Sequence, residues 1–327
     1  MSQSTVRLWM GLCCAALALY VPNLVTVPYF MHLIILALVW VILAQGQNLM
    51  QGLVGYVSIT QAGFMGVGAY FSTLLTLKLG CSVWLTIFMT PCVTGLLSVL
   101  VGYPSLRVKG HYFAIVTLAY NMVIFTILLT YSSLTGGEAG ISNIARPSSF
   151  SLWGYVVNFE GRSNSNYYLL VLLFAALSTG LCGLILHSRV GRVLLAIRQN
   201  EVLADAIGIQ TWRYKLFAFV MSAALAGLAG ALYAHYIGFL NPEPFGVDQS
   251  LNAILAVILG GSGTLTGPVV GAFAVTFLPE YLRIADSYRL ITYGFILVIA
   301  TIFLPRGLVP VAKDACIFLF SFLFKRK

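Results

Sequence analysis

Long apolar stretches alternate with short polar ones along nearly the whole chain. Eight of them are about as long as a helix needs to cross a bilayer, roughly 20 residues. We read the first as a retained signal anchor, because no clear small-residue cleavage site precedes Pro22. The pattern predicts an all-α polytopic membrane protein. The eight stretches cover residues 8–28, 31–49, 53–77, 84–104, 112–131, 167–187, 216–240 and 288–304.

A ninth apolar stretch, residues 250–282, is interrupted by the run GGSGTLTGP at 260–268. Glycine and proline at this density cannot continue one straight helix. We therefore predict two helical arms, 250–259 and 268–282, that meet at the break. Irregular backbone at membrane depth is tolerated only where protein or water satisfies its polar groups. This makes the break a candidate pathway or gate; tight helix packing through small residues is the alternative. The candidate residues are Gly260, Gly261 and Gly263.

Composition and charge support a lipid environment. The chain is 60% hydrophobic and 8% charged, whereas an ordinary soluble domain is about 25% charged. If the N-terminus is cytoplasmic and the two arms form a hairpin, most of the 18 Lys and Arg residues fall on the cytoplasmic side. That asymmetry explains the net charge of +9 without nucleic acid. It predicts an even number of crossings, about ten helices or eight plus a re-entrant hairpin, with both termini cytoplasmic.

Two polar segments between the spans are long enough to carry structure. Residues 132–166 are predicted to lie outside, in the periplasm, and residues 188–215 inside. The inner segment contains a predicted short helix at 201–207, which Gly208 ends. Two interpretations are open for this helix: part of a solvated loop, or a docking helix for a cytoplasmic subunit.

The sequence lacks the usual motifs of an enzyme or a self-powered pump. No GxxxxGK[ST] phosphate loop occurs, and the six cysteines show no CxxC spacing for a metal site. None of the nine acidic residues falls at mid-bilayer in the span map, where an ion-coupled transporter commonly has an ionisable group. We expect no cofactor and no catalytic residue, and we expect energy to enter through another polypeptide.

Neutral polar residues are present inside the predicted spans. Such groups can line a pore that passes a zwitterion without trapping it. They can equally form hydrogen bonds between helices, each typically below about 1–2 kcal/mol. The pathway candidates of this kind are Ser58, Gln61, Thr117 and Asn121.

Several segments resemble the LivM-type permeases of branched-chain amino acid ABC importers, within the LivH/LivM permease family. The segments occur in the family's order along most of the chain. They are residues 55–70 (GYVSITQAGFMGVGAY), 107–118 (RVKGHYFAIVTL), 196–201 (AIRQNE), 226–232 (AGLAGAL) and the glycine-rich run from 260 to 272.

This resemblance implies one permease domain over residues 1–327, with an importer-type permease fold, in a bacterial inner membrane. It implies a homologous LivH-type permease, two cytoplasmic ATPase subunits that bind ATP and Mg, and a periplasmic binding protein as partners. The cargo would be leucine, isoleucine or valine; urea, short-chain amides or other amino acids are the alternative. An ion-coupled secondary transporter is the rival of another class. Residues 188–215 would be the coupling loop, through Arg192, Arg198, Glu201, Ala204, Asp205, Ala206 and Gly208.

Overall fold

The computed structural model describes residues 20–22, 27–108, 110–152, 155–157, 159, 165–282, 294–295, 298 and 307–311. The predicted spans 8–28 and 288–304 lie almost entirely outside these residues. The number of crossings and the side on which the termini lie therefore stay predictions.

Six of the described helices are long and apolar enough to cross a membrane. These helices pack against one another, so the chain in this part is a helix bundle, as its apolar pattern predicts. The six are α2 (Pro28–Asn48) with its continuation η1 (Leu49–Val54), α3 (Gln61–Leu79), α4 (Val83–Ser105), α5 (His111–Thr130), α7 (Ser165–His187) and α10 (Thr211–Ile237).

The predicted pair of arms is confirmed as two shorter helices, α11 (Val247–Gly260) and α12 (Gly267–Tyr281). Their backbones lie so close that a Cβ atom on Gly271 would overlap the carbonyl oxygen of Ala256. Gly261 and Gly263 in the turn both have positive φ, 119° and 80°, which favours glycine. The break in the sequence is therefore a tight helical hairpin.

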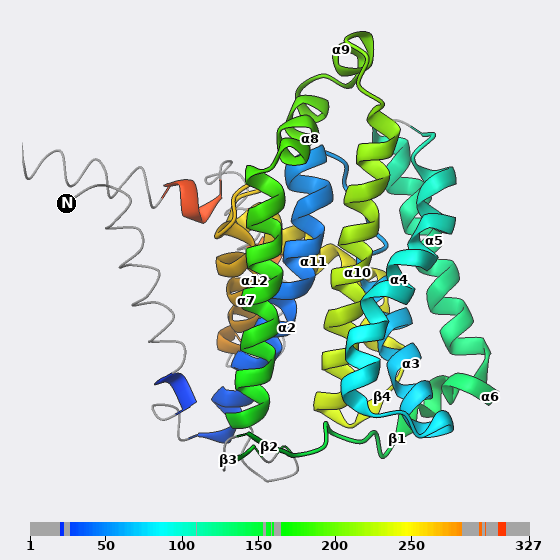
Figure 1. Ribbon diagram of the computed structural model, residues 1–327, viewed down its shortest axis with the longest axis vertical. Coiled ribbons are helices and arrows are strands. Elements are labelled where there is room, and N and C mark those ends of the chain that lie inside the picture. Colours follow the sequence, from blue (N-terminus) through cyan, green and yellow to red (C-terminus); the bar gives the residue numbers. More distant parts are fainter. Residues whose placement is uncertain are drawn as a thin grey trace, which may run out of the picture.

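Short elements occupy the two ends of the bundle (Figure 1). α8 (Arg189–Gln199) and α9 (Glu201–Ala206) lie at one end, where α4 also finishes and α10 begins. At the other end β1 (Ile141–Ser142) pairs antiparallel with β4 (Phe239–Leu240). The predicted polar segments thus fall at opposite ends. The remaining short elements are α6 (Ser132–Thr135), η2 (Gly137–Ala139), the antiparallel pair β2 (Phe150–Leu152) and β3 (Tyr155–Val157), and η3 (Glu243–Phe245).

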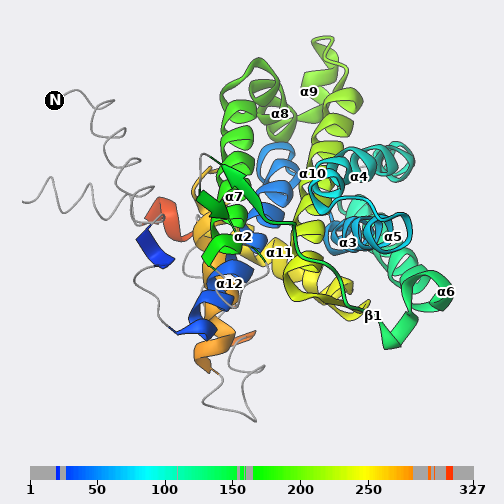
Figure 2. The same ribbon diagram turned by 60° about the horizontal axis from the view of Figure 1, so that its bottom comes forward.

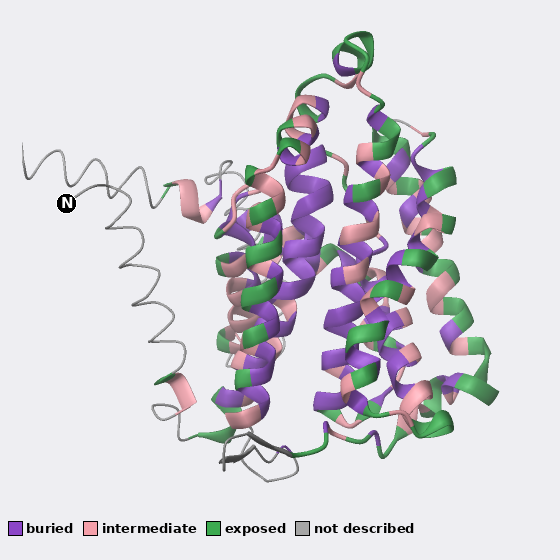
Figure 3. Cartoon of the chain, in the orientation of Figure 1, coloured by how far each residue is buried: buried purple, intermediate pink, exposed green. Residues whose placement is uncertain are grey.

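α2 and α10 form the centre of the bundle (Figure 2). α10 packs against α2, α3 and α4, and α2 packs against α7 and α12. Glycine permits the closest of these contacts: a Cβ on Gly68 would overlap the backbone of Gly227, and one on Gly230 would overlap the carbonyl oxygen of Met65. Burial follows the same arrangement, since α2 is buried along most of its length while α5 exposes one side (Figure 3).

The predicted boundary between the second and third spans is wrong. The helix does not stop at 49 but continues as the π-helical segment η1 to Val54, and the third span begins at Gln61 rather than 53. Gly55 ends the helix in the left-handed region, with φ 84°, and residues 55–60 are irregular. Apolar residues continue through this break, so hydropathy alone gave no sign of it.

Candidate functional site

Residues 188–210 form an elbow of two short helices. The Ser188 hydroxyl accepts a hydrogen bond from the Gly191 N–H, 3.2 Å, and caps α8. Asn200 is extended, and its Oδ1 accepts from the Leu203 N–H, 3.0 Å, to cap α9. Gly208, with φ 87°, turns the chain after α9. The predicted helix at 201–207 is confirmed as Glu201–Ala206.

Glu201 braces this elbow against the rest of the bundle. Its Oε1 lies 2.7 Å from Nζ of Lys215 in α10, and the two side chains are 16% and 3% exposed. Its Oε2 accepts a hydrogen bond from the Tyr56 hydroxyl, 2.6 Å. Burial, together with the Glu201 carboxylate, raises the pKa of Tyr56 above its usual range. The start of α9 is thereby bonded to both α10 and the irregular segment before α3.

The outward face of α9 is apolar. Val202, Leu203 and Ile207 are 70%, 61% and 69% exposed, and Ala206 is exposed beside them. Ala204 points the other way and is buried. These four residues form an exposed apolar patch, Asp205 is exposed next to them, and Ala204 lies buried behind the patch.

The two arginines of the predicted coupling loop differ in surroundings. The Arg198 guanidinium donates to the carbonyl oxygen of Gly52, and its aliphatic stem packs on Gly55. Arg192 is exposed. Asp205 accepts a hydrogen bond from the Thr211 hydroxyl, 2.8 Å, which ties α9 to the first turn of α10. Arg198, Glu201 and Asp205 thus form contacts that hold the elbow within the chain, although Arg198 and Asp205 remain exposed like Arg192.

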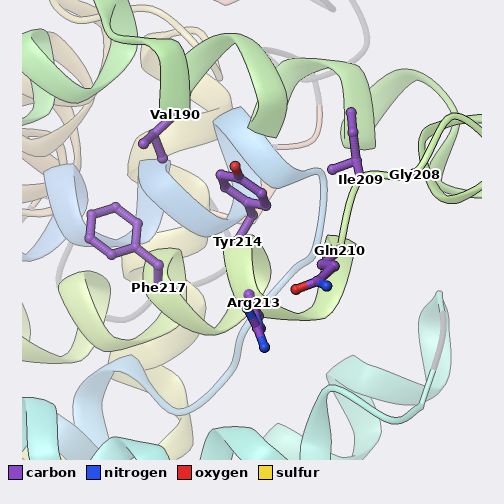
Figure 4. A pocket seen from close by; sticks show the side chains of 7 residues that line it. All are labelled: Val190, Gly208, Ile209, Gln210, Arg213, Tyr214 and Phe217. Carbon is purple, nitrogen blue, oxygen red and sulfur yellow. The ribbon is translucent and has the colours of Figure 1, made fainter.

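A cavity of about 540 Å³ lies beside the elbow (Figure 4). Its lining comes from the start of α8, the connection after α9 and the first turns of α10. The contacts of Glu201 and Asp205 therefore fix one side of the elbow to the bundle, whereas the other side borders this cavity. The cavity is lined by Val190, Gly208, Ile209, Gln210, Arg213, Tyr214 and Phe217.

All four neutral pathway candidates gather where α3 begins. The Asn121 Oδ1 accepts from the Gly63 N–H, 2.7 Å, and the Thr117 hydroxyl accepts from the Ile59 N–H, 3.1 Å. Ser58 and Thr60 hydroxyls lie 3.0 Å apart. These contacts supply partners to backbone that the break leaves outside a regular helix.

Gln61 joins the same junction to α2 and α10. Its Nε2 donates to the carbonyl oxygens of Leu43 and Ser222, and the Ser222 hydroxyl donates back to its Oε1, 3.1 Å. The Ser250 hydroxyl accepts from the Ala62 N–H, 2.9 Å. The first turn of α3 is therefore held by α2, α5, α10 and α11.

The glycine candidates lie elsewhere, at the turn between α11 and α12. The Asn48 Oδ1 accepts from the Gly263 N–H, 2.8 Å, and its Nδ2 donates to the Thr264 carbonyl, 3.0 Å. Gln45 donates to the Leu265 carbonyl, 2.9 Å. The Arg198 guanidinium lies against Gly263. Gly261 and Gly263 thus belong with the elbow and the end of α2, rather than with the junction at α3.

Sequence reasoning did not include Tyr56, Lys215, Ser222 and Ser250 among the site candidates, although these residues hold these groups. The sequence does offer one indication for Lys215: it is a cation directly before an apolar span, next to a loop that contains acidic residues. The polar residues inside spans gave no signal that separates them from others. Within the described ranges, no group of three or more His, Cys, Asp or Glu side chains lies together as a metal site.

A family model described as the branched-chain amino acid transport system permease component matches residues 29–301. The chain belongs to this family. It is 32% identical over 294 residues to the high-affinity branched-chain amino acid transport system permease protein LivM of Salmonella typhimurium LT2, with 85% of this chain and 69% of the relative covered. The LivM of Escherichia coli K12 matches to the same extent.

The second permease type of the family is also related to this chain. LivH of Escherichia coli K12 is 25% identical over 286 residues, covering 82% of this chain and 90% of the relative. The identity is higher to LivM than to LivH, so this family member resembles the LivM type. No solved structure matches the chain.

Proposed function

We propose that this chain is a LivM-type permease subunit of an ABC importer that carries leucine, isoleucine or valine across the bacterial inner membrane. A homologous LivH-type permease completes the membrane part. Two cytoplasmic ATPase subunits bind and hydrolyse ATP, and a periplasmic binding protein delivers the amino acid. The chain itself performs no covalent chemistry. The family match supports the transport role, and the relatives named LivM and LivH support a pair of unlike permeases.

The observation that carries the coupling role is the apolar tip of α9 on a braced elbow. Val202, Leu203 and Ile207 form a contiguous exposed apolar patch on a short helix, and a contiguous patch of this kind supports a protein contact there. A short helix fixed at its first residue to α10 and Tyr56 passes rigid-body movement to both. An ATPase that grips Val202, Leu203, Ala206 and Ile207 would therefore move the segment that leads into α3.

The junction at α3 is our proposed pathway element. At this junction Nδ2 of Asn121 is buried without a hydrogen-bond partner, and farther along α3 the same holds for the Tyr70 and Thr73 hydroxyls. Neutral groups with unused hydrogen-bonding capacity suit the brief binding of a zwitterion. We include the turn of Gly260, Gly261 and Gly263 as a gate element. Its contacts with Arg198 of the elbow and Asn48 of α2 would transmit movement of the elbow to this turn.

The test is reconstitution of the whole importer in liposomes. Radiolabelled leucine should accumulate only with ATP inside, both permeases present and the binding protein outside. Ile207→Asp should abolish ATP-driven uptake and co-purification of the ATPase, because it places a charge in an apolar contact. Arg189→Gln, on α8 but outside the tip, is the matched control. Accumulation by the chain alone on an ion gradient would reject the proposal.

A further inference from the structure

Two arginines stack on two touching aromatic rings at the end of the bundle that carries the elbow. The Arg107 guanidinium lies 4.9 Å from the centroid of the Tyr103 ring and donates to the Tyr103 hydroxyl, 3.1 Å. The Arg213 guanidinium lies 5.4 Å from the centroid of the Trp212 ring. The rings of Tyr103 and Trp212 meet edge to face at 6.3 Å. Two positive charges thus flank one aromatic pair.

A cavity of about 270 Å³ opens beside this aromatic pair, between the end of α4 and the start of α10. Tyr103, Leu106 and Arg107 form one wall, and Trp212 and Leu216 form the other. In the described part of the chain neither Arg107 nor Arg213 forms an ion pair; the pair found there joins Lys215 to Glu201. The two guanidinium groups therefore have no protein counter-ion there.

An exposed apolar strip leads along α4 to the cavity. Leu96 and Leu100 are each 73% exposed and Tyr103 is 50% exposed. At spacings of four and three residues they share one helix face. Arg107 lies two residues past the end of α4 and contacts the Tyr103 ring. The strip is apolar along the membrane-spanning part of the helix and cationic at its end. This arrangement of an apolar strip and a cationic end matches an amphiphile with a hydrocarbon tail and an anionic head.

We propose that this groove binds an anionic glycerophospholipid of the cytoplasmic leaflet. The phosphate lies at the cavity opening against Arg107, Arg213 adds positive charge from its place beside the Trp212 ring, and one acyl chain runs along Leu96 and Leu100. Basic groups beside a span attract anionic headgroups, and Trp and Tyr favour the headgroup level. A cytoplasmic protein subunit fits less well, because the strip continues into the span, where only lipid or another membrane helix reaches.

Trp212 provides a direct probe of occupancy. The chain has five tryptophans, so the difference between the full-length protein and its Trp212→Phe variant isolates the Trp212 signal. The protein is placed in phosphatidylcholine nanodiscs that contain a small fraction of a lipid brominated near the glycerol. This brominated lipid is phosphatidylglycerol in one sample and phosphatidylcholine in the other. Brominated phosphatidylglycerol should quench Trp212 at lower mole fraction than brominated phosphatidylcholine.

The charge variants make the test specific. Arg107→Gln/Arg213→Gln should reduce the preference for phosphatidylglycerol by about fivefold for each arginine removed. Arg189→Gln/Arg192→Gln removes the same charge from exposed positions at the same end and should keep the preference. Gel filtration of both double variants verifies their folding.

Four results would overturn the proposal. They are equal quenching by both lipids, an unchanged preference in Arg107→Gln/Arg213→Gln, loss of quenching on adding excess inorganic phosphate, and loss of quenching when the ATPase binds. The third would assign the site to free phosphate, and the fourth would make the surface a protein interface.

Discussion

Lys215 Nζ lies 2.7 Å from Glu201 Oε1, and the lysine side chain is almost fully buried. The two residues come from different elements: Lys215 lies in the second turn of α10, and Glu201 is the first residue of α9. Withdrawing two charges from water is costly, and the pair offsets this cost only while both members are present. The Tyr56 hydroxyl adds a third contact to the same carboxylate. The pair therefore fixes the position of the elbow.

Removal of one member of this pair should destabilise the protein. We expect Glu201→Gln and Lys215→Met each to lower the free energy of unfolding by about 3 kcal/mol, because each leaves the other member without its opposite charge. Thermal unfolding of the purified chain in detergent measures the change.

The double variant Glu201→Gln/Lys215→Met is the control. It removes both charges and should recover most of the lost stability, so the two changes should be strongly non-additive. If the single losses simply add in the double variant, the two groups do not stabilise each other.

Ala206 and Ala204 should respond differently to the same substitution. Ala206 is exposed on the tip of α9, so Ala206→Trp should leave stability within about 0.5 kcal/mol but abolish uptake and ATPase binding. Ala204 is buried, so Ala204→Trp should lower stability by overpacking. Thermal unfolding and co-purification separate the two effects. Normal leucine uptake by Ala206→Trp would exclude docking at this face.

Transport should depend on the hydroxyl group of Thr117 more than on the size of its side chain. Thr117→Val removes the acceptor for the Ile59 N–H and leaves a partly buried donor unpaired, which costs about 1 kcal/mol. We expect slower uptake with normal assembly of the subunits. Thr117→Ser keeps the hydroxyl and should transport normally. Equal uptake by the two variants would show that this hydrogen bond does not hold the junction.

The contact between α11 and α12 should tolerate no side chain at Gly271. Gly271→Ala places a methyl group on the Ala256 carbonyl, so the hairpin must open or the protein must fail to fold. Yield and thermal stability in detergent report the loss. Gly180 of α7 has open space around its Cβ position, so Gly180→Ala should be neutral or stabilise by up to about 1 kcal/mol. Comparable losses in both variants would argue against close packing.

Hydropathy predicted the long helices well but not the break before α3. Residues 49–57 are mostly apolar, so their composition resembles that of the helices on either side. The break depends on Gly55 in the left-handed region and on partners from distant helices, such as Thr117 for Ile59. Thr117 and Ile59 are 58 residues apart in sequence, and no local pattern specifies such a pair.

The candidate residues show the same division. Gly208 and the capping residue Asn200 act locally, and the short helix between them was predictable. The burial of Ala204 and the engagement of Arg198 by Gly52 depend on how the elbow meets η1. From the sequence, these two residues resembled partner-binding groups as much as Ala206 and Arg192 did.

The sequence by itself determined that the chain is a bundle of apolar helices, that residues 250–282 are a broken pair, and that a short capped helix follows Asn200. These features follow from residue type and spacing within a few turns of chain. Only the tertiary structure decided which polar groups meet: Glu201 with Lys215 and Tyr56, Asn121 with Gly63, and Asn48 with Gly263. A buried polar group must find a partner, but the identity of that partner depends on the packing of whole helices.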